Sequence, residues 1–248
     1  MNTYRADLHV HTVLSPCAGV EMIPPLIVQE ALQRNINLIA ITDHNASANI
    51  AAVQKAAVNT PLTVLPGIEL QTEEDVHSLC LFDTLEQIEE FQAFINTHLP
   101  PIKNKADFFG EQFVVDETGD FVRREEQLVI LSANISLKEA QIKVAELDGL
   151  FIPAHINRKA FGLFSHLGML PKDMHIDALE VSRHISLEEA IKKYPDITKY
   201  PLMQNGDVHF LADFLGATVF HMLAPTITEI RLALKNSDGR SLENTTAA

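Results

Sequence analysis

The stretch Asp7-Leu8-His9-Val10-His11-Thr12 lies close behind the N-terminus and indicates how the rest of the chain is organised. It completes a run, residues 4–11, whose composition is typical of a β-strand. Because successive side chains of a strand point to opposite faces, His9 and His11 are expected to point the same way. Two neighbouring imidazoles on one face are well placed to bind a single metal ion.

The same pattern, an apolar strand-like run that carries or ends in histidine, aspartate or glutamate, recurs along the chain. Five later examples are Ile41-Thr42-Asp43-His44, Gly67-Ile68-Glu69, Val76-His77, Pro153-Ala154-His155 and Gly206-Asp207-Val208-His209. A single histidine is more often a structural or surface residue than a metal ligand. Independent structural histidines, however, have no reason to prefer strand ends, so the joint placement indicates a shared site.

Strand-like runs alternate with segments of helical period over most of the chain. The strand-like runs are residues 4–11, 37–42, 62–68, 76–82, 150–154, 176–181, 201–204 and 217–223, and the helical segments are residues 23–34, 46–58, 85–98, 137–147, 187–194 and 227–235. This alternation is typical of an α/β fold with a parallel sheet and outer helices. So many strands in 248 residues favour a closed or nearly closed barrel, whose catalytic groups gather at the C-terminal ends of the strands.

Residues 100–127 interrupt this alternation. Pro100-Pro101 ends a helical segment, and residues 113–122 are typical of two short strands around a turn that contains Gly119. We therefore expect one barrel domain over residues 1–236, with residues 100–127 as an inserted hairpin or lid that shapes one wall of the cleft. The polar residues 237–248 are expected to form a flexible C-terminal tail.

Composition narrows the classes of function. Hydrophobic residues make up 46% of the chain, enough for a sizeable core. The net charge of −14 and the lack of a basic run disfavour nucleic acid as a partner. Two cysteines are too few for a disulfide framework. Neither a signal peptide nor an apolar run of roughly 20 residues is present, so we predict a cytoplasmic protein with no membrane partner.

The residue types at the strand ends predict a catalytic metal centre. Histidine and carboxylate ligands without a cysteine cluster favour a catalytic over a structural metal, and they suit Zn²⁺, Mn²⁺ or Fe²⁺. Seven or more ligands are too many for one ion, so two or three ions sharing a carboxylate are expected. Glu69 is the natural bridge, because a carboxylate has two oxygens and an imidazole offers one lone pair. Closely spaced ions favour hydrolysis, with a phosphoester as the leading substrate.

In order and spacing, the five later motifs and Asp-Leu-His-Val-His-Thr resemble those of the PHP (polymerase and histidinol phosphatase) family, over about residues 5–210. The resemblance implies a distorted (β/α)₇ TIM-like barrel with a trinuclear metal site at its C-terminal rim. Members of the family include histidinol-phosphate phosphatases, nucleotide and oligonucleotide phosphoesterases, and domains attached to bacterial DNA polymerases.

The resemblance also implies a ligand set, carried over motif by motif. One ion would be held by His9, His11, Glu69 and Asp207, a second by Glu69, His77 and His155, and a third by His44, His209 and a residue of the loop after the first strand. Many relatives place His or Asp at that last position, where this chain has Cys17. A thiolate binds Zn²⁺ or Fe²⁺ well and harder ions poorly. Either Cys17 binds a softer metal, or the third site is weak and two ions remain bound; otherwise Cys17 is simply a small loop residue.

Phosphate requires positive charge besides the metals. Arg158, three residues after His155, is the main candidate for a bidentate phosphate clamp, and the alternative is a surface arginine paired with an acid. Arg183 and His184 are further candidates for substrate binding. His98, His166 and His175 are expected to be structural, whereas His184 and His221 each follow a strand-like run and could line the cleft. Asp7 and Asp43 neighbour expected ligands and could orient them.

These residues predict metal-dependent hydrolysis of a small phosphomonoester, a metabolite or nucleotide. A hydroxide bridging two metals would attack phosphorus in line, with Asp207, His209 and Arg158 as catalytic residues. An exonuclease or oligonucleotide phosphodiesterase is one alternative, and a non-catalytic metal-binding docking module is another. No Gly-x-x-x-x-Gly-Lys-Ser/Thr loop is present, which argues against NTP-driven chemistry.

Overall fold

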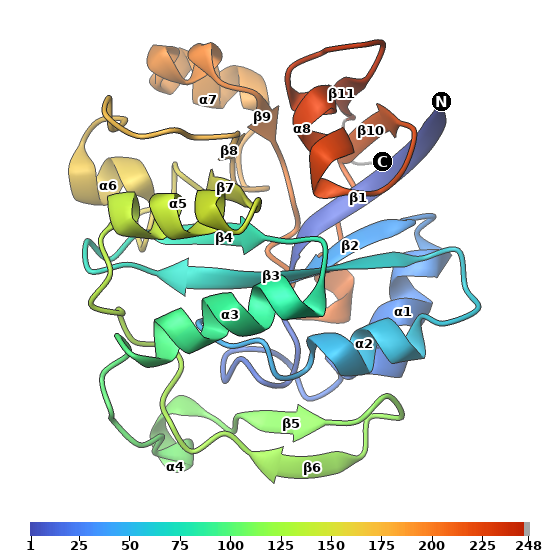
Figure 1. Cartoon of the computed structure of the whole chain (residues 1–248), viewed down its shortest axis with the longest axis vertical. Helices are drawn as coiled ribbons and strands as arrows, with labels where there is room; N and C mark the ends of the chain where they lie inside the picture. Colours follow the sequence, from blue (N-terminus) through green and yellow to red (C-terminus); the bar gives the residue numbers. More distant parts are fainter. Residues whose placement is uncertain (246–248) are drawn as a thin grey trace.

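A curled seven-stranded sheet forms the frame of the molecule (Figure 1). The computed structural model describes residues 1–245. The strands lie in the order β11-β10-β1-β2-β3-β4-β7. Their bounds are β1 (Asn2–Val10), β2 (Leu38–Ile41), β3 (Thr63–Gln71), β4 (His77–Leu81), β7 (Leu150–Pro153), β10 (Thr218–Met222) and β11 (Ser241–Asn244). A separate two-stranded sheet pairs β8 (Leu179–Glu180) with β9 (Leu202–Met203).

The sheet is mixed and not uniformly parallel. The pairs β1–β2, β2–β3 and β8–β9 are parallel. The pairs β3–β4, β4–β7, β1–β10 and β10–β11 are antiparallel. The edge of β1 that does not face β2 pairs with two different segments. Its first residues pair with β10, and its C-terminal end forms a bridge from Val10 to Val208.

The barrel expected from the alternation of strands and helices does not close, and this part of the prediction is wrong. Strands β8 and β9 have only two residues each, too few for ladders to both edges of the larger sheet. Backbone bonds join β7 to the β8 region from Ile156 N to Glu180 O, 2.9 Å, and from Asp177 N to Phe151 O, 3.2 Å. Val208 donates to His9 O and accepts from His11 N. The result is a half-barrel whose edges are bridged by isolated hydrogen bonds.

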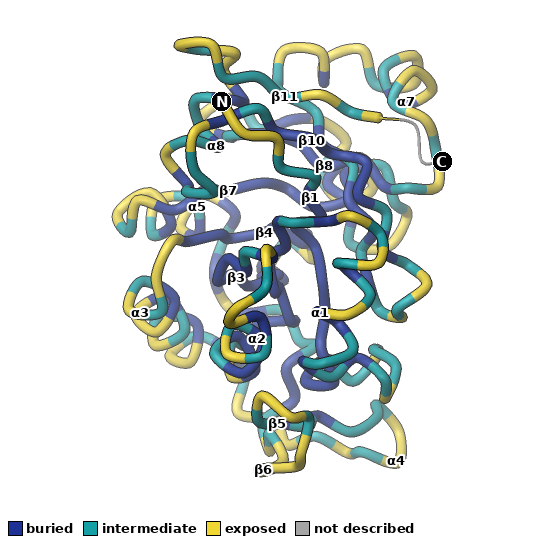
Figure 2. The backbone as a smooth tube through the Cα atoms, turned by 90° about the vertical axis from the view of Figure 1, so that its right-hand side faces the viewer, coloured by how far each residue is buried: buried dark blue, intermediate teal, exposed yellow. Residues whose placement is uncertain are grey.

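Two apolar clusters bury both faces of the central strands. In β2, Leu38 and Ala40 belong to the cluster that includes residues of α8, whereas Ile39 and Ile41 belong to the cluster that the outer helices cover. Figure 2 shows the strands buried and the outward faces of α2 and α3 exposed. The helices are α1 (Pro24–Gln33), α2 (Ile50–Ala56), α3 (Leu85–Asn96), α4 (Ala106–Phe109), α5 (Leu137–Glu146), α6 (Leu163–Leu167), α7 (Leu187–Lys193) and α8 (Ile227–Leu234), with short 3₁₀ turns η1 (Pro195–Lys199) and η2 (Leu211–Asp213). Continuous burial explains why β2 consists of apolar residues alone.

The segment 100–127 contains the expected hairpin, formed by β5 (Phe113–Val115) and β6 (Phe121–Arg124), with α4 before it. The hairpin lies at one end of the molecule (Figure 1) and attaches to the loop after β1, where Phe113 N donates to Val13 O at 2.9 Å. Part of the expected flexible tail is instead strand β11; residues 246–248 lie outside the described residues. No helix within residues 1–245 is long and apolar enough to cross a membrane.

Candidate metal centre

The expected ligands converge at one rim of the half-barrel. His9 and His11 lie at the C-terminal end of β1, and His44 follows β2. Glu69 lies in β3 beside His44, to which an isolated bridge joins it. His77 begins a strand and does not end one. It reaches the same rim because β4 runs antiparallel to β3 and pairs His77 with Gln71.

The remaining three expected ligands, His155, Asp207 and His209, lie in segments without regular secondary structure. His155 follows β7, and Asp207 and His209 flank the residue that bridges to β1. His155 and Asp207 have φ angles of 28° and 50°, in a region that is costly for residues with a Cβ. The surrounding contacts therefore hold both side chains in place against a local conformational preference.

Glu69 lies at the middle of the cluster and is fully buried. Its Oε1 lies 3.2 Å from His9 Nε2, 2.8 Å from His77 Nδ1 and 3.0 Å from His155 Nε2. Its Oε2 lies 3.4 Å from His11 Nε2 and 2.9 Å from His44 Nδ1. One carboxylate thus contacts five imidazoles, as expected of a shared ligand.

Several of these atoms lack a hydrogen-bond partner. His9 Nε2, His11 Nε2, His44 Nδ1, Glu69 Oε2 and His155 Nδ1 are buried and unpaired within residues 1–245. His44 Nδ1 and Glu69 Oε2 are near in distance but not aligned for a hydrogen bond. Unpaired buried polar atoms are costly and call for an explanation. Except for His155 Nδ1, whose ring contacts Glu69 through Nε2, these atoms converge, and divalent cations there would satisfy them, so the donor set fits a metal centre.

Three groups of potential ligand atoms are compact enough to hold an ion each. They are His9, His11 and Glu69; His44, Glu69 and His77; and His11, His44 and His209. These groups differ from the ligand sets that the resemblance implies. His44 lies with Glu69 and His77 as well as with His209, and His11 belongs to two of the three groups. Asp207 adjoins the first group, with Oδ1 3.4 Å from His9 Nε2. The buried histidine and glutamate clusters are consistent with a multinuclear site.

Hydrogen bonds on the far side of the rings aim the imidazoles. Nδ1 of His11 donates to Ser15 Oγ, 3.0 Å, which itself donates to Asp43 Oδ1, 2.6 Å. Nδ1 of His209 donates to Asp207 O, 3.0 Å. A ring whose Nδ1 carries the proton presents the lone pair of Nε2 to the cluster.

Glu180 also orients an imidazole, that of His9, although it was not among the residues expected at the site. Both its oxygens lie 3.1 Å from His9 Nδ1, and it also accepts from His155 N and Asn205 Nδ2. The signal was available, since Glu180 falls in the strand-like run 176–181 and so follows the pattern of the other ligands.

The two aspartates that were expected to orient the histidines act indirectly. Asp43 reaches His11 only through Ser15. Asp7 does not hydrogen-bond an imidazole; its oxygens accept from Gly206 N, 2.9 Å, and Leu215 N, 2.8 Å. It therefore holds the backbone next to Asp207.

The substrate-binding candidates lie beside the cluster. The guanidinium of Arg158 forms a short ion pair with Asp207. A cavity of about 270 Å³ at the metal centre includes Cys17, Arg158 and Asp207 in its lining. These residues also line an adjoining cavity of about 330 Å³, together with Arg183 and His184. The acid that pairs with Arg158 is thus itself part of the centre, so the pairing does not make Arg158 an ordinary surface arginine.

Cys17 lies at the edge of the centre. It is exposed and lines the same cavity as His44 and His209, but it is absent from the three compact ligand groups. The protein atoms packed around the thiol raise the pKa of Cys17, but the neighbouring His209 and His44 lower it to about 6. A thiolate at this position could bind a soft metal, which stays a prediction.

The charges within the cluster shift the pKa values of its members strongly in the metal-free protein. Burial disfavours the charged forms, but Glu69 and Cys17 together outweigh it and raise the pKa of His44 to about 10. Asp207 and Cys17 likewise outweigh burial and raise the pKa of His209 to about 11. Burial lowers the pKa of His77 to about 4. The imidazoles hold the pKa of Glu69 well below its usual range despite burial.

The histidines expected to be structural lie outside the cluster. His98 bonds Phe94 O and Thr97, and His175 lies 3.3 Å from Asp177. His166 accepts from Phe161 N. His221 bonds Thr3 and lies near Glu243 on the outer strands, so it does not line the cleft.

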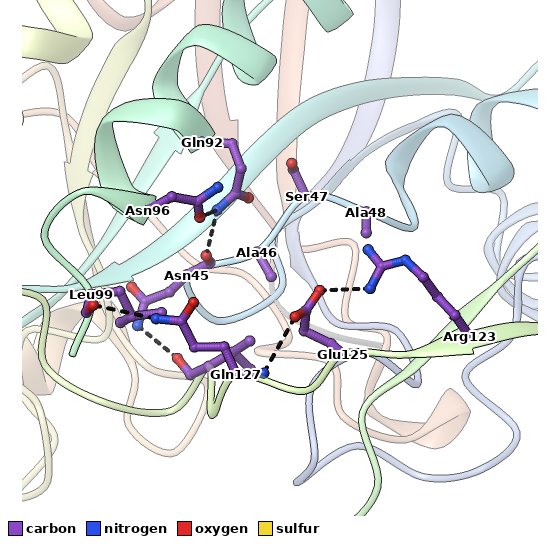
Figure 3. A pocket seen from close by; sticks show the side chains of 11 residues that line it. Asn45, Ala46, Ser47, Ala48, Gln92, Asn96, Leu99, Arg123, Glu125 and Gln127 are labelled. Carbon is purple, nitrogen blue, oxygen red and sulfur yellow. Dashed lines mark hydrogen bonds and ion pairs between the residues drawn. The ribbon is translucent and has the colours of Figure 1, made fainter. Parts of the chain in front are cut away.

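Another, polar cavity of about 270 Å³ includes Asn45, the neighbour of His44, in its lining (Figure 3). The side-chain amide of Gln92, which lines this cavity, donates to Asn45 O at 3.0 Å and to Asn96 Oδ1 at 2.8 Å. Asn45 itself donates to the carbonyls of Val129 and Leu131. These bonds fasten the segment that follows the hairpin, and Ile130 of that segment lines the metal cavity. The segment directly after the insertion of residues 100–127 therefore forms part of the wall of the metal cavity.

A curled α/β sheet with buried histidine and glutamate clusters that could hold several ions is typical of a class of metal-dependent hydrolases. A model of the PHP domain family matches residues 7–149, more than half of the chain. The chain therefore belongs to the PHP domain family of metal-dependent phosphoesterases, as its motifs indicate.

Three relatives extend the comparison. The uncharacterised protein YqxK of Bacillus subtilis is 23% identical over 275 aligned positions, which cover 98% of this chain and 64% of YqxK. The 5′–3′ exoribonuclease Rnm of Salmonella typhimurium is 32% identical over 75 residues, which cover 29% of this chain and 25% of Rnm. The lesion-specific endonuclease PfuEndoQ of Pyrococcus furiosus has the same fold, with a TM-score of 0.70 and 22% identity over 97% of this chain and 58% of that chain. The chain thus spans less than two thirds of YqxK and of PfuEndoQ.

Proposed function

We propose that this chain hydrolyses phosphodiester bonds in nucleic acid at a centre that holds two or three divalent metal ions. The proposed ligands are His9, His11, His44, Glu69, His77, His155, Asp207 and His209, with Cys17 as a further candidate. Imidazole and carboxylate donors suit Zn²⁺, Mn²⁺ or Fe²⁺.

The observation that carries the proposal is the group of buried, unpaired imidazole and carboxylate atoms around Glu69. Within residues 1–245, four rings and one carboxylate carry buried atoms without a hydrogen-bond partner, and a bound ligand would offset the cost of burying them. Divalent ions held there would supply Lewis-acid charge at phosphoryl oxygens. Glu180 and Ser15 hold the ring orientations that such binding needs.

Arg158 supplies the protein's own positive charge at this place. Within residues 1–245 its guanidinium bonds only Asp207, so its other N–H groups remain available. It lines both cavities, and a phosphoryl group there would meet a charge-assisted donor. We expect Arg158 to orient the phosphoryl group and to stabilise charge that develops on its oxygens.

Two features favour a nucleic-acid phosphodiester over the small phosphomonoester expected from the sequence. The metal cavity continues into a second cavity that includes Arg183 and His184, which leaves room beyond a single phosphoryl group. The relatives named above include an exoribonuclease and a lesion-specific endonuclease, and a further structure with a similar fold, of Endonuclease Q, is a complex with a 27-mer duplex substrate that has an abasic lesion at the active site. The net charge of −14 is an average over the chain and does not describe the local field at the cleft.

A comparison of ester types tests the proposal. Metal-loaded protein should hydrolyse bis-p-nitrophenyl phosphate and end-labelled DNA or RNA faster than p-nitrophenyl phosphate. Faster turnover of the monoester would support the small-phosphatase alternative. Full metal loading without turnover of any ester would support the non-catalytic docking module.

Glu69→Gln is the decisive variant because it removes the central charge at almost unchanged volume. Metal content, measured by mass spectrometry, should drop, and kcat should fall by at least about a hundredfold. Glu73→Gln, an exposed glutamate near the end of the same strand, is the matched control and should leave both unchanged. Retention of metal and activity by Glu69→Gln would contradict the proposed centre.

A further inference from the structure

Three arginines from distant parts of the chain converge on one short loop, residues 213–216. Arg5 of β1 donates from Nε to Gly216 O at 2.8 Å. Arg34, directly after α1, donates from Nη1 to Phe214 O at 2.7 Å. Arg183, after β8, donates from Nη1 to Asp213 O at 3.0 Å. We call Arg5, Arg34 and Arg183 the arginine cluster.

Nearby acids form ion pairs with two of the three arginines. Arg183 pairs with Asp213 at 2.6 Å, and Arg34 pairs with Glu30 at 2.6 Å. Arg5 has no acidic partner within residues 1–245, and its two terminal nitrogens make no hydrogen bond there. The loop thus gathers three guanidinium groups, and the terminal nitrogens of Arg5 are free to bind an anion. Like charges held together favour the binding of an anion.

The loop is fixed in the position that brings the arginines together. Asp7 accepts from Leu215 N at 2.8 Å and from Gly216 N at 3.3 Å. Gly216 has a φ of 57°, and a Cβ at this position would lie 2.8 Å from Arg5 Nε. Glycine is therefore needed for the turn and for the close approach of Arg5. Groups held in advance lose little entropy when a ligand binds.

The arginine cluster is connected to the metal centre by adjoining cavities. A cavity of about 380 Å³ is lined by all three arginines and by residues 212–215. It shares Arg183 and Asp213 with the 330 Å³ cavity, which in turn shares Arg158 and Asp207 with the cavity at the metal centre. The path from the metal centre therefore passes Arg158 and then Arg183 before it reaches Arg5 and Arg34.

We propose that the arginine cluster binds backbone phosphates of a nucleic-acid strand whose scissile phosphate lies at the metal centre. The inference rests on the proposed function and narrows it to substrates several nucleotides long. Guanidinium groups match phosphate oxygens with paired N–H donors, whereas a mononucleotide at the metal centre would leave Arg5 and Arg34 without a bound phosphate. DNA and RNA share this backbone chemistry, so the cluster by itself does not distinguish them.

Substrate length and the double variant Arg5→Gln/Arg34→Gln test the proposal in the metal-loaded full chain. In the wild type, KM should fall from dinucleotides to dodecamers. In the variant, KM for the dodecamer should rise by about tenfold or more, and the salt dependence of binding should weaken by about two charges. Turnover of bis-p-nitrophenyl phosphate should not change, because neither arginine lines the metal cavity. Lys138→Gln, which removes an exposed positive charge paired with Asp173, is the matched control.

Unchanged KM and salt dependence in the double variant would overturn the proposal. An equal loss on the small diester would also overturn it, because it would indicate a structural role for the two arginines. Fluorescence anisotropy with a labelled dodecamer, as DNA and as RNA, measures binding independently of turnover. Binding that depends on the two arginines without cleavage would refute the proposed hydrolysis but keep the phosphate-binding cluster. Cleavage of the dodecamer with the same KM and salt dependence in the double variant would refute only the phosphate-binding role of the arginine cluster.

Discussion

At the scale of single residues, the chemistry of each imidazole depends on the group that binds its other nitrogen. His9 is bonded through Nδ1 to Glu180, and His11 is bonded through Nδ1 to Ser15. Each ring therefore presents Nε2, and a carboxylate partner makes that nitrogen a stronger donor to a metal. Residues that touch no substrate thus control the properties of the centre.

Glu180→Gln tests this control. The amide keeps the size of the side chain but removes the charge that supports His9 and accepts from His155 N. We expect metal affinity to fall by about 10- to 100-fold, measured by competition with a chromogenic chelator, with an unchanged circular dichroism spectrum. Glu188→Gln, an exposed glutamate of α7, is the control. Equal affinities for the two variants would contradict the role given to Glu180.

The histidines of the metal-free protein also predict a dependence of stability on pH. Folding raises the pKa of His44 from 6.5 to about 10 and that of His209 to about 11. Their protonated forms therefore stabilise the metal-free fold fully below pH 6.5, and this contribution is lost as the pH rises toward these folded values. The Tm of chelator-treated protein should fall over this window, and metal binding near pH 8 should release protons, as measured by calorimetry in different buffers. A Tm that rises from pH 6.5 to 9 would contradict the assignment.

At the scale of elements, capping side chains determine where several helices begin. Thr84 with Gln87, Ser136 with Glu139 and Ser186 with Glu189 form reciprocal capping boxes. The similar pair Thr226 and Glu229 forms only half a box, with Thr226 accepting from Glu229 N. The Glu229 carboxylate is instead bonded to Leu223 N and Arg240. The pattern in sequence is the same, and competition from distant partners decides whether the second bond forms.

This difference should be measurable. Ser136→Ala removes a complete capping box and should cost about 1 kcal/mol of unfolding free energy in urea. Thr226→Ala removes one long bond of 3.4 Å and should cost clearly less. A larger loss for Thr226→Ala would contradict this account of the two helix starts.

At the scale of the whole molecule, the metal centre joins the open ends of the half-barrel. Glu69 of β3 contacts His9 of β1 and His155 after β7, and Asp207 lies beside the end of β1. The two-stranded sheet adds few backbone bonds between these edges. Bound ions would therefore link segments that the sheet itself leaves unclosed.

Metal removal should accordingly loosen one side of the molecule. Saturation at a hundredfold excess over Kd corresponds to about 2.7 kcal/mol of stabilisation. We expect a chelator to lower the Tm and to speed hydrogen exchange at residues 155–158 and 205–209, while α3 changes little. Uniform exchange changes, or none, would contradict this linking role.

Much of the centre could be predicted from residue types and local periodicity. The strand-like runs that contain His9 or end just before His44, Glu69 and His155 can be found from their pattern, because apolar alternation and ligand chemistry are properties of short segments. The helix bounds agree within a few residues for the same reason. Glu180 was missed because its strand has only two residues and its role depends on contact with His9.

The sequence by itself determined the α/β alternation, the kinds of ligand and their order along the chain, since these depend on residues close together in the chain. Only the tertiary structure decided that the barrel stays open, because closure depends on pairing between strands such as β8 and β9 and distant edges. It also decided the reversed direction of β4, which brings His77 to the rim. The gathering of Arg5, Arg34 and Arg183 around one loop is likewise a property of the folded chain, because no local pattern relates these positions.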